Sequence, residues 1–513
     1  MQNHTVTSTM KMTAATNSTS YFRLVAHRDV MIAHIILMTS AWAIFLPVAV
    51  MLSISNSPTR IPVQLIFTLT NAFGALLGAV FSHQTPELYA GQKHSPVGWV
   101  GIVSSIVWLA LTVVPKDDVK KSSYSENCQL YRQSYEALLR SSHSSSSESE
   151  HEYAEDDLDS IPEENTDKKL EQPDRLSAFT ARAIYSKAMA WMASKYPLQA
   201  LQILRAIFDR TILVLGFICI VTGVIVFSGS FRGIHVFNGL AHSIKGGIFF
   251  WYGLLTFGRW LGCLADFGWA WNQRPGKAVV GSRAARMPSM EFFESATMCF
   301  YGVTNVWLEH LSNTDGAWRP RDLEHVAIAF LFFGGGLVGM LINSVSLRKL
   351  TMAHLRSLIN RRTNTNTEAD QEASLLPDQL QLSINPIPAI LLFLLGFMMS
   401  SHHQPSKIST MLHMLWGRTF MVAAFSRLAT YAILYLRPPT SCIPPRPPTE
   451  LVASFCIIAG GLLLMLSNTS TIEALEYHNL DAMFIFTNVV GLTAIVMAWE
   501  AVCLAIKGWG LKQ

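Results

Sequence analysis

Apolar stretches long enough to cross a lipid bilayer recur along most of the chain. The hydrocarbon layer is ~30 Å thick, and an α-helix needs about 20 apolar residues to cross it. Because backbone polar groups cannot stay unpaired in lipid, each such stretch is expected to be helical. The sequence therefore predicts an all-α polytopic membrane protein of about eleven transmembrane helices. They are expected at 30–52, 61–82, 97–114, 210–228, 240–263, 290–310, 323–345, 386–401, 411–436, 450–468 and 482–506.

The low content of charged residues agrees with this class. Only 14% of the 513 residues are charged and half are hydrophobic, whereas about 25% of the residues of a typical soluble protein are charged. The formal net charge of +4 is too small to indicate a nucleic-acid partner. The lipid bilayer is the partner that the composition predicts.

The distribution of Lys and Arg among the loops predicts the orientation. Cytosolic loops of membrane proteins are enriched in these residues. The richer of the two sets of alternate loops contains Arg274, Lys277, Arg283, Arg286, Arg348, Lys349, Arg356, Arg361, Arg362, Arg437, Arg446, Lys507 and Lys512. We therefore expect a multi-pass protein of the plasma membrane or an endomembrane, with its N-terminus outside or lumenal and its C-terminus cytosolic. The sequons at Asn3 and Asn17 are then candidate glycosylation sites in the outer tail.

One long polar segment divides the membrane-embedded part in two. Residues 115–204 contain the serine-rich and acidic runs SSHSSSSESE and EDDLDSIPEENTD, a composition typical of disorder. We expect a largely disordered cytosolic loop, more readily a solvated linker than a docking site. The predicted organisation is then a tail at 1–29, a four-helix module at 30–114 and 205–229, the loop, and a C-terminal membrane domain at 230–513.

The histidines gather on one side of the predicted topology. Thirteen of the sixteen fall in outer loops or at outer helix ends, and imidazole is a common ligand of transition metals and haem iron. His34 and His94 form the best-defined pair, because the first and third helices run in the same direction and place both side chains near one depth. They are candidate axial ligands of a haem. The alternative is that the outer histidines are polar residues suited to the membrane interface.

A second group of candidate ligands comes from the outer ends of the fifth to eleventh helices. Mixed imidazole and carboxylate ligands suit zinc, iron, copper or manganese. For Glu324 a simpler reading is that the helix N-terminus favours a carboxylate. The predicted metal-binding residues are His242, Glu309, His310, Glu324, His325, His402, His403, His413 and His478, with Glu473 and Glu476 close by in the sequence.

Charged residues within the predicted helices need partners, because an unpaired charge in lipid is costly. Arg427 and Glu500 both fall in the inner half and are predicted to form a buried pair; Arg418 lies nearer the middle. Arg259 and Asp266 flank the inner end of the fifth helix, where structural pairing and a proton route both stay open. The glycine runs at 246–247 and 334–336 predict close helix packing.

Several motifs resemble known families. HIILMTSAWAIFLP at 34–47 resembles the first helix of cytochrome b561-type electron-transfer modules, and HSPVGW at 94–99 resembles their third. This resemblance implies a haem held by His34 and His94. The second and fourth helices lack the histidines of the other haem pair, so at most one haem b is expected. AHSIKGGIFFWYGLLTFGRWLGCLADFGWAWN at 241–272 and LEHVAIAFLFFGGGLVGML at 323–341 resemble the fungal Ytp-type transmembrane proteins.

These observations favour a haem-binding redox protein, an electron-transfer oxidoreductase that reduces iron or copper at the outer face. No glycine-rich nicotinamide-binding fingerprint occurs in the cytosolic segments. The expected electron donor is therefore ascorbate or another protein. A transporter for a metal ion or small solute is the alternative, using the C-terminal domain. A third interpretation is a non-catalytic membrane partner protein that binds through the 115–204 loop.

Overall fold

The computed structural model describes residues 20–113, 198–310, 318, 320–354, 357, 384–402 and 404–513. Every regular element in these ranges is a helix. Nearly all of the loop predicted to be disordered, and both sequons at Asn3 and Asn17, lie outside the described residues. The prediction of an all-α polytopic membrane protein is confirmed.

Eight helices in the described part of the chain are long and apolar enough to cross a membrane. They are Arg28–Ile54, Arg60–Gln84, His94–Val113, Ala200–Ser228, Leu323–Ile342, Lys407–Leu436, Pro448–Leu466 and Ala482–Gly510. Three further helices lie beside them: α9 (Val236–Leu261), α11 (Met290–His310) and the short apolar α16 (Ile387–Ser401). The eleven predicted segments are thus all helical, and their number as membrane spans stays a prediction.

Large apolar side chains on the outer surface of the bundle explain why these helices need lipid. Leu69, Phe73, Phe300 and Ile495 each expose more than half of their surface. A monomer in water rarely exposes continuous apolar patches of this extent. In a bilayer the same surface contacts acyl chains, and the helices satisfy their own backbone hydrogen bonds.

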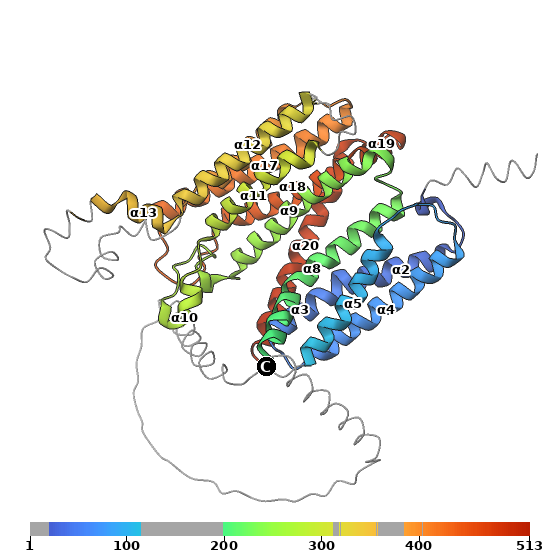
Figure 1. Cartoon of the computed structure of the whole chain (residues 1–513), viewed down its shortest axis with the longest axis horizontal. Helices are drawn as coiled ribbons and strands as arrows, with labels where there is room; N and C mark the ends of the chain where they lie inside the picture. The colour runs from blue at the N-terminus through green and yellow to red at the C-terminus, as the bar shows by residue number, and fades with distance from the viewer. Residues whose placement is uncertain are drawn as a thin grey trace, which may run out of the picture.

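The four-helix module consists of one interrupted helix and three continuous ones. The first is α2 (Arg28–Thr39), the π-helical turn η2 (Ser40–Phe45) and α3 (Leu46–Ile54). It is followed by α4 (Arg60–Gln84), α5 (His94–Val113) and α8 (Leu198–Ser228). α4 packs against α2 and α5, and α5 against α8. Figure 1 shows the four side by side in blue and green. α8 begins well before the predicted residue 210, and α5 begins at His94 rather than 97.

Pro47 explains the π-helical turn in the first helix. Proline has no N–H to donate to the carbonyl four residues earlier, here that of Ala43, and its ring disturbs the preceding turn. The Trp499 indole, on the last helix α20 (Ala482–Gly510), donates to the Ala43 carbonyl over 2.9 Å. The interruption therefore provides an anchoring point for a helix from the other half of the chain.

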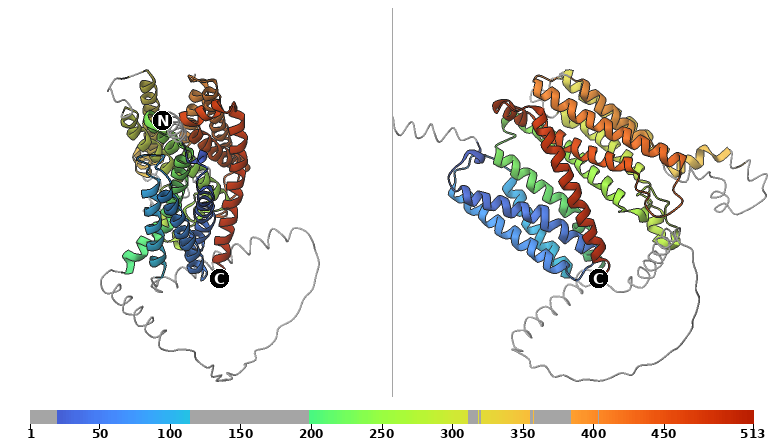
Figure 2. Two further views of the ribbon diagram at one scale, coloured as in Figure 1. Left: turned by 90° about the vertical axis from the view of Figure 1, so that its right-hand side faces the viewer. Right: turned by 180° about the vertical axis from the view of Figure 1, so that it is seen from behind.

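The C-terminal domain packs its helices in close pairs. α9 lies along α18 (Pro448–Leu466), α11 along α12 (Pro320–Ile342), and α17 (Lys407–Leu436) along both α16 and α18. Short helices α10 (Lys277–Ala285), α13 (Val345–Thr351) and α19 (Thr469–Tyr477) lie at the ends. α20 contacts α18 and α9 on one side and α3 on the other. Figure 2 shows α20, in dark red, lying between the two halves.

Glycines permit the closest helix contacts, as the sequence predicted. A Cβ added to Gly461 of α18 would lie 2.6 Å from the Phe250 backbone nitrogen of α9. Gly246 meets the Gly461 carbonyl in the same contact, and Gly336 of α12 approaches the backbone of α11 at Cys299. Any larger residue at these positions would push the backbones apart.

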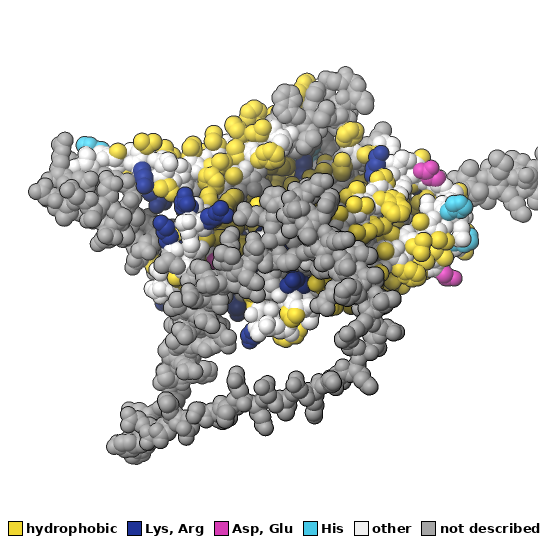
Figure 3. Space-filling view, turned by 60° about the horizontal axis from the view of Figure 1, so that its bottom comes forward, with side chains coloured by type: hydrophobic (Ala, Val, Ile, Leu, Met, Phe, Trp, Pro, Cys, Tyr) yellow, Lys and Arg dark blue, Asp and Glu magenta, His cyan; other side chains and the backbone are white. Residues whose placement is uncertain are grey.

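The two ends of the bundle differ in the side chains that they present. We call the end at which α2, α5, α9 and α17 begin the histidine end, and the other the C-terminal end, because α20 finishes there. α10 and α13, at the C-terminal end, carry Arg283, Arg348 and Lys349. In Figure 3 dark-blue Lys and Arg side chains gather mainly on the left and at the lower centre, whereas most of the visible cyan His surface stands at the right-hand edge.

Candidate functional sites: two histidine pairs and a buried charge layer

His34 and His94 meet inside the four-helix module. His34 lies two turns into α2 and His94 is the first residue of α5. Their ring centroids are 6.3 Å apart and the rings are nearly perpendicular, at 78°. The sequence-based expectation that both side chains reach one depth is therefore matched by the geometry.

The hydrogen bonds of the two imidazoles define which nitrogen carries the proton. His34 Nδ1 lies 2.7 Å from the Gly74 carbonyl of α4, which can only accept. His94 Nδ1 lies 3.1 Å from Thr222 Oγ1 of α8, and that hydroxyl donates to the Ile218 carbonyl over 2.8 Å. Each Nδ1 is therefore the donor, and in a neutral imidazole Nε2 then carries the lone pair. An imidazole oriented through Nδ1 in this way can ligate a metal through Nε2.

Glycine lies beside each imidazole. A Cβ on Gly78 of α4 would lie 2.8 Å from the His34 ring, and one on Gly223 of α8 would lie 3.2 Å from the His94 ring. The missing side chains allow the rings to lie against their neighbouring helices. Sequence reasoning did not single out these glycines or Thr222, because their roles depend on pairings between helices far apart in the chain.

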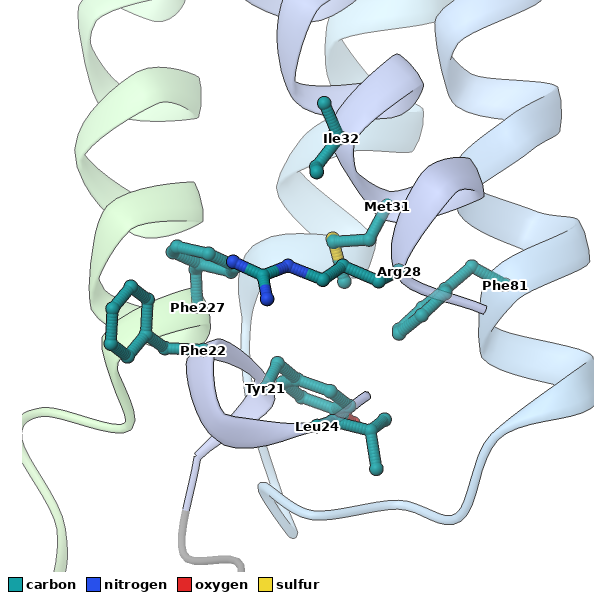
Figure 4. Close-up of a pocket in the computed structure, with 8 residues that line it drawn as sticks. All are labelled: Tyr21, Phe22, Leu24, Arg28, Met31, Ile32, Phe81 and Phe227. Atoms are coloured by element: carbon teal, nitrogen blue, oxygen red, sulfur yellow. The ribbon is translucent and has the colours of Figure 1, made fainter. Parts of the chain in front are cut away.

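A small cavity of about 50 Å³ lies one turn nearer the histidine end. Figure 4 shows its lining. The Arg28 side chain extends toward Phe227, and the side chains of Met31 and Phe81 approach from the other side. Met31 precedes His34 by one turn, and Phe81 follows Gly78 by one turn. The helix η1 (Tyr21–Arg23) contributes Tyr21 and Phe22 and covers the cavity.

An aromatic column fills the module on the other side of the histidine pair. The rings of Trp42 and Phe67 are 5.2 Å apart, those of Phe67 and Trp108 are 6.2 Å apart, and all three are buried. The Trp108 indole donates to Asp209 Oδ1 over 2.8 Å at the C-terminal end. Arg205 lies one turn away, 3.8 Å from the same carboxylate. The column therefore runs from the histidines to a buried ion pair.

A second histidine pair lies in the C-terminal domain. His242 of α9 and His413 of α17 have ring centroids 5.9 Å apart at 88°. His242 Nδ1 donates to the Leu464 carbonyl over 3.0 Å, and His413 Nδ1 donates to the Ser409 carbonyl over 2.8 Å. Both were predicted metal ligands, and the structure brings them together at the histidine end.

The remaining predicted ligands lie in separate contacts. His402 Nδ1 is 3.6 Å from Glu324, and His235 Nε2 is 3.7 Å from Glu473. Ser406 donates to Glu476, and the His478 ring packs against Tyr477. His325 lies in the first turns of α12. Within the described residues no three His, Cys, Asp or Glu side chains lie close enough to hold a metal ion. His403 and the side chains of Glu309 and His310 lie outside those residues.

A layer of buried charges crosses the C-terminal domain near its C-terminal end. Arg259 of α9 lies 3.1 Å from Glu294 of α11. Arg427 of α17 lies 3.3 Å from the same Glu294 oxygen and 2.6 Å from Glu450 of α18. All four are at most 5% exposed. We call these residues, together with the buried Glu291 one turn before Glu294, the charge layer.

The predicted pair of Arg427 with Glu500 is not the one that forms. Arg427 is bound by Glu294 and Glu450, and its Nη1 also donates a hydrogen bond to the Tyr252 hydroxyl oxygen over 3.2 Å. Glu500 lies against α9, where an added Cβ on Gly258 would be 3.1 Å from its Oε1. Depth in the membrane alone could not distinguish these partners, because α20 lies on a different side of α9.

The helical bundle, its apolar surface and its two polar ends define an integral membrane protein. The family model described as "Protein YTP1-like, C-terminal" matches residues 215–508, and a domain of unknown function matches residues 15–116. The chain belongs to the Protein YTP1-like family. The first match starts inside α8, so the family boundary does not coincide with the end of the four-helix module.

Three curated fungal proteins are similar to this chain. An uncharacterized membrane protein of Schizosaccharomyces pombe is 35% identical over 94% of both chains. An uncharacterized membrane protein of Saccharomyces cerevisiae is 40% identical over 55% of this chain and 44% of its own. Protein YTP1 of the same yeast is 23% identical over 42% of this chain and 39% of its own. No solved structure matches the chain.

Proposed function

We propose that this membrane protein binds one haem b between His34 and His94 and uses it to transfer electrons. The observation that carries the proposal is the close approach of the two imidazoles, each with its Nδ1 held by a partner on a neighbouring helix. A metal bound about 2 Å from one nitrogen of each ring, on opposite sides, would place the ring centroids roughly 6 Å apart. The separation of 6.3 Å fits that arrangement.

The surroundings of the pair leave little open space for a haem. Gly78 and Gly223 reduce the bulk beside the rings, and the cavity at the histidine end begins one turn away. At about 50 Å³ it holds little more than one water, whose share of liquid volume is ~30 Å³. A porphyrin would therefore have to displace the rings of Phe81 and Phe227. Arg28 is the cation in the lining that could pair with a haem carboxylate.

Haem held by His34 and His94 would supply one-electron redox chemistry at the histidine end. Under the predicted orientation this end faces outside, so iron or copper in that compartment is the proposed acceptor. Ascorbate or a protein would be the donor. The residues of this chain would hold the haem by two neutral imidazoles and exclude water from it by the apolar and aromatic packing around Trp42.

An absorption spectrum of the full-length protein in detergent tests the proposal. We expect a Soret band and the sharp visible bands of a low-spin haem with two histidine ligands on reduction. His34→Ala and His94→Ala should each abolish the sharp low-spin bands, because one remaining imidazole cannot complete the coordination. His83→Ala is the matched control, since His83 lies exposed near the same end of the module.

The second histidine pair makes the test specific. If the bands disappear in His242→Ala or His413→Ala but persist in His34→Ala and His94→Ala, the haem lies in the C-terminal domain and our assignment is wrong. Protein that contains no haem after expression with excess haem precursor would contradict the proposed function itself.

A further inference from the structure

The charge layer contains more buried acids than buried bases. Its arginines are Arg259 and Arg427, and its carboxyl groups are those of Glu291, Glu294 and Glu450. A buried charge without compensation is strongly unfavourable, and it is normally paired or neutralised by a proton. With two positive charges and three carboxyl groups, the layer is neutral when one carboxyl group is protonated.

The contacts indicate where the proton is held. Glu450 is fully buried against Arg427, and Glu294 lies between the two arginines. The salt bridges of Arg259 and Arg427 in the described part of the chain go to Glu294 and Glu450. Glu291 lies one helical turn from Glu294, where two side chains on one face are about 5–6 Å apart. The Glu291–Glu294 pair is therefore the place where a second negative charge is least compensated.

The other groups that face the layer do not alter this count. Tyr431 is a buried phenol and Tyr252 a partly buried one, and Arg259 also stacks on Trp271, 4.3 Å from the ring centroid. Glu500 lies on the far side of α9. Arg274 lies near Glu291 at the exposed rim, where water weakens its influence, and its guanidinium donates to the Phe267 and Ala285 carbonyls.

Some polar atoms of the layer have no partner among the described residues. Glu294 Oε2, Glu450 Oε2 and Arg427 Nη2 are each enclosed without a hydrogen bond. Such atoms are costly in a membrane interior, where ionisable residues commonly mark routes for ions and protons. A carboxyl oxygen in this state is ready to accept a proton without breaking an existing bond.

We propose that the charge layer is a proton-binding site that holds one exchangeable proton on the Glu291–Glu294 pair. It is independent of the haem, because none of its groups touches the four-helix module's histidines. Arg274 and the exposed loop around it provide the connection to water at the C-terminal end.

Infrared spectroscopy of the full-length protein in lipid nanodiscs tests the site. The variant Glu500→Gln serves as the background, so that this other buried carboxyl group does not contribute. At neutral pH we expect one carbonyl band of a protonated carboxyl group, shifted by D₂O. Glu291→Gln, Glu294→Gln and Glu450→Gln should each remove the band, because two carboxylates then balance two arginines.

The arginines provide the opposite test. Arg427→Gln should add a second protonated carboxyl band, because one positive charge then remains for three carboxyl groups. Glu324→Gln, an exposed change, should leave the spectrum unaltered. A background spectrum without any protonated carboxyl band would overturn the proposal and show that Arg274 and the start of α11 keep Glu291 ionised. A band that survives all three Glu→Gln changes would overturn it too.

Discussion

The four-helix module and the C-terminal domain place a histidine pair at the same end but differ at the other. In the module, the space beyond the histidines is filled by Trp42, Phe67 and Trp108, and the buried ion pair beside them is that of Arg205 and Asp209. In the C-terminal domain the corresponding region holds the five groups of the charge layer. Neutral histidine ligands must be oriented by hydrogen bonds and must have space for the group that they bind, whereas buried charges must be paired with opposite charges. The two halves should therefore respond differently to substitution.

The largest difference should follow from removing one partner of the charge layer. Glu450→Leu leaves Arg427 with Glu294 alone, and breaking a buried pair in this way costs about 3–5 kcal/mol. The free energy of unfolding, followed by tryptophan fluorescence in mixed detergent, should fall by that amount. The double change Arg427→Met with Glu450→Leu should recover most of the loss. If the double variant is less stable than Glu450→Leu, the loss of the Arg427–Glu450 pair does not explain the lower unfolding free energy of Glu450→Leu.

The histidine pair of the module should lose function before it loses stability. Thr222→Val removes the acceptor of the His94 Nδ1 proton, and losing such an orienting partner typically weakens metal binding about 10–100-fold. Haem retention during dialysis against apomyoglobin measures this change. Thr211→Val on the same helix is the control, since the Thr211 hydroxyl bonds only its own helix. Equal retention in both variants would contradict an orienting role for Thr222.

Helix packing in the C-terminal domain should tolerate almost no added volume. Gly461→Ala would place a methyl group 2.6 Å from the Phe250 backbone nitrogen and force α9 and α18 apart. We expect a loss of about 1–2 kcal/mol in unfolding free energy, as for other overpacked cores. Gly491→Ala, where nothing lies within 4 Å, should be neutral or slightly stabilising. If Gly491→Ala also lowered the unfolding free energy, the loss in Gly461→Ala could not be assigned to steric overlap with α9.

The exposed ionic contacts at the histidine end should matter least. Glu324 and His402 are 3.6 Å apart with more than half of the glutamate side chain exposed. Exposed pairs contribute ~0–1 kcal/mol, so Glu324→Gln should leave the melting temperature nearly unchanged at any pH from 5 to 8. A clear destabilisation in Glu324→Gln alone would indicate that this contact belongs to a larger buried network.

The sequence allowed most of the helices to be predicted but few of their partners. Apolar runs predicted every long helix, and the shared direction of the first and third helices predicted that His34 and His94 meet. Glu294 and Glu450 were missed because each lies near a helix start, where the helix dipole favours a carboxylate and its presence does not by itself indicate a function. Their role comes from Arg427, which is far from both in sequence. Gly78 and Thr222 were missed because their contacts with His34 and His94 join different helices.

The proline in the first helix has a consequence for how the chain is made. Pro47 leaves the Ala43 carbonyl without its helical donor, and the indole of Trp499 supplies the replacement. Trp499 follows Ala43 by 456 residues in the chain. The Ala43 carbonyl is therefore synthesised long before the indole that pairs with it, and the helices between them are made first. Insertion factors that shield polar groups in lipid would be needed at this carbonyl until α20 has been inserted.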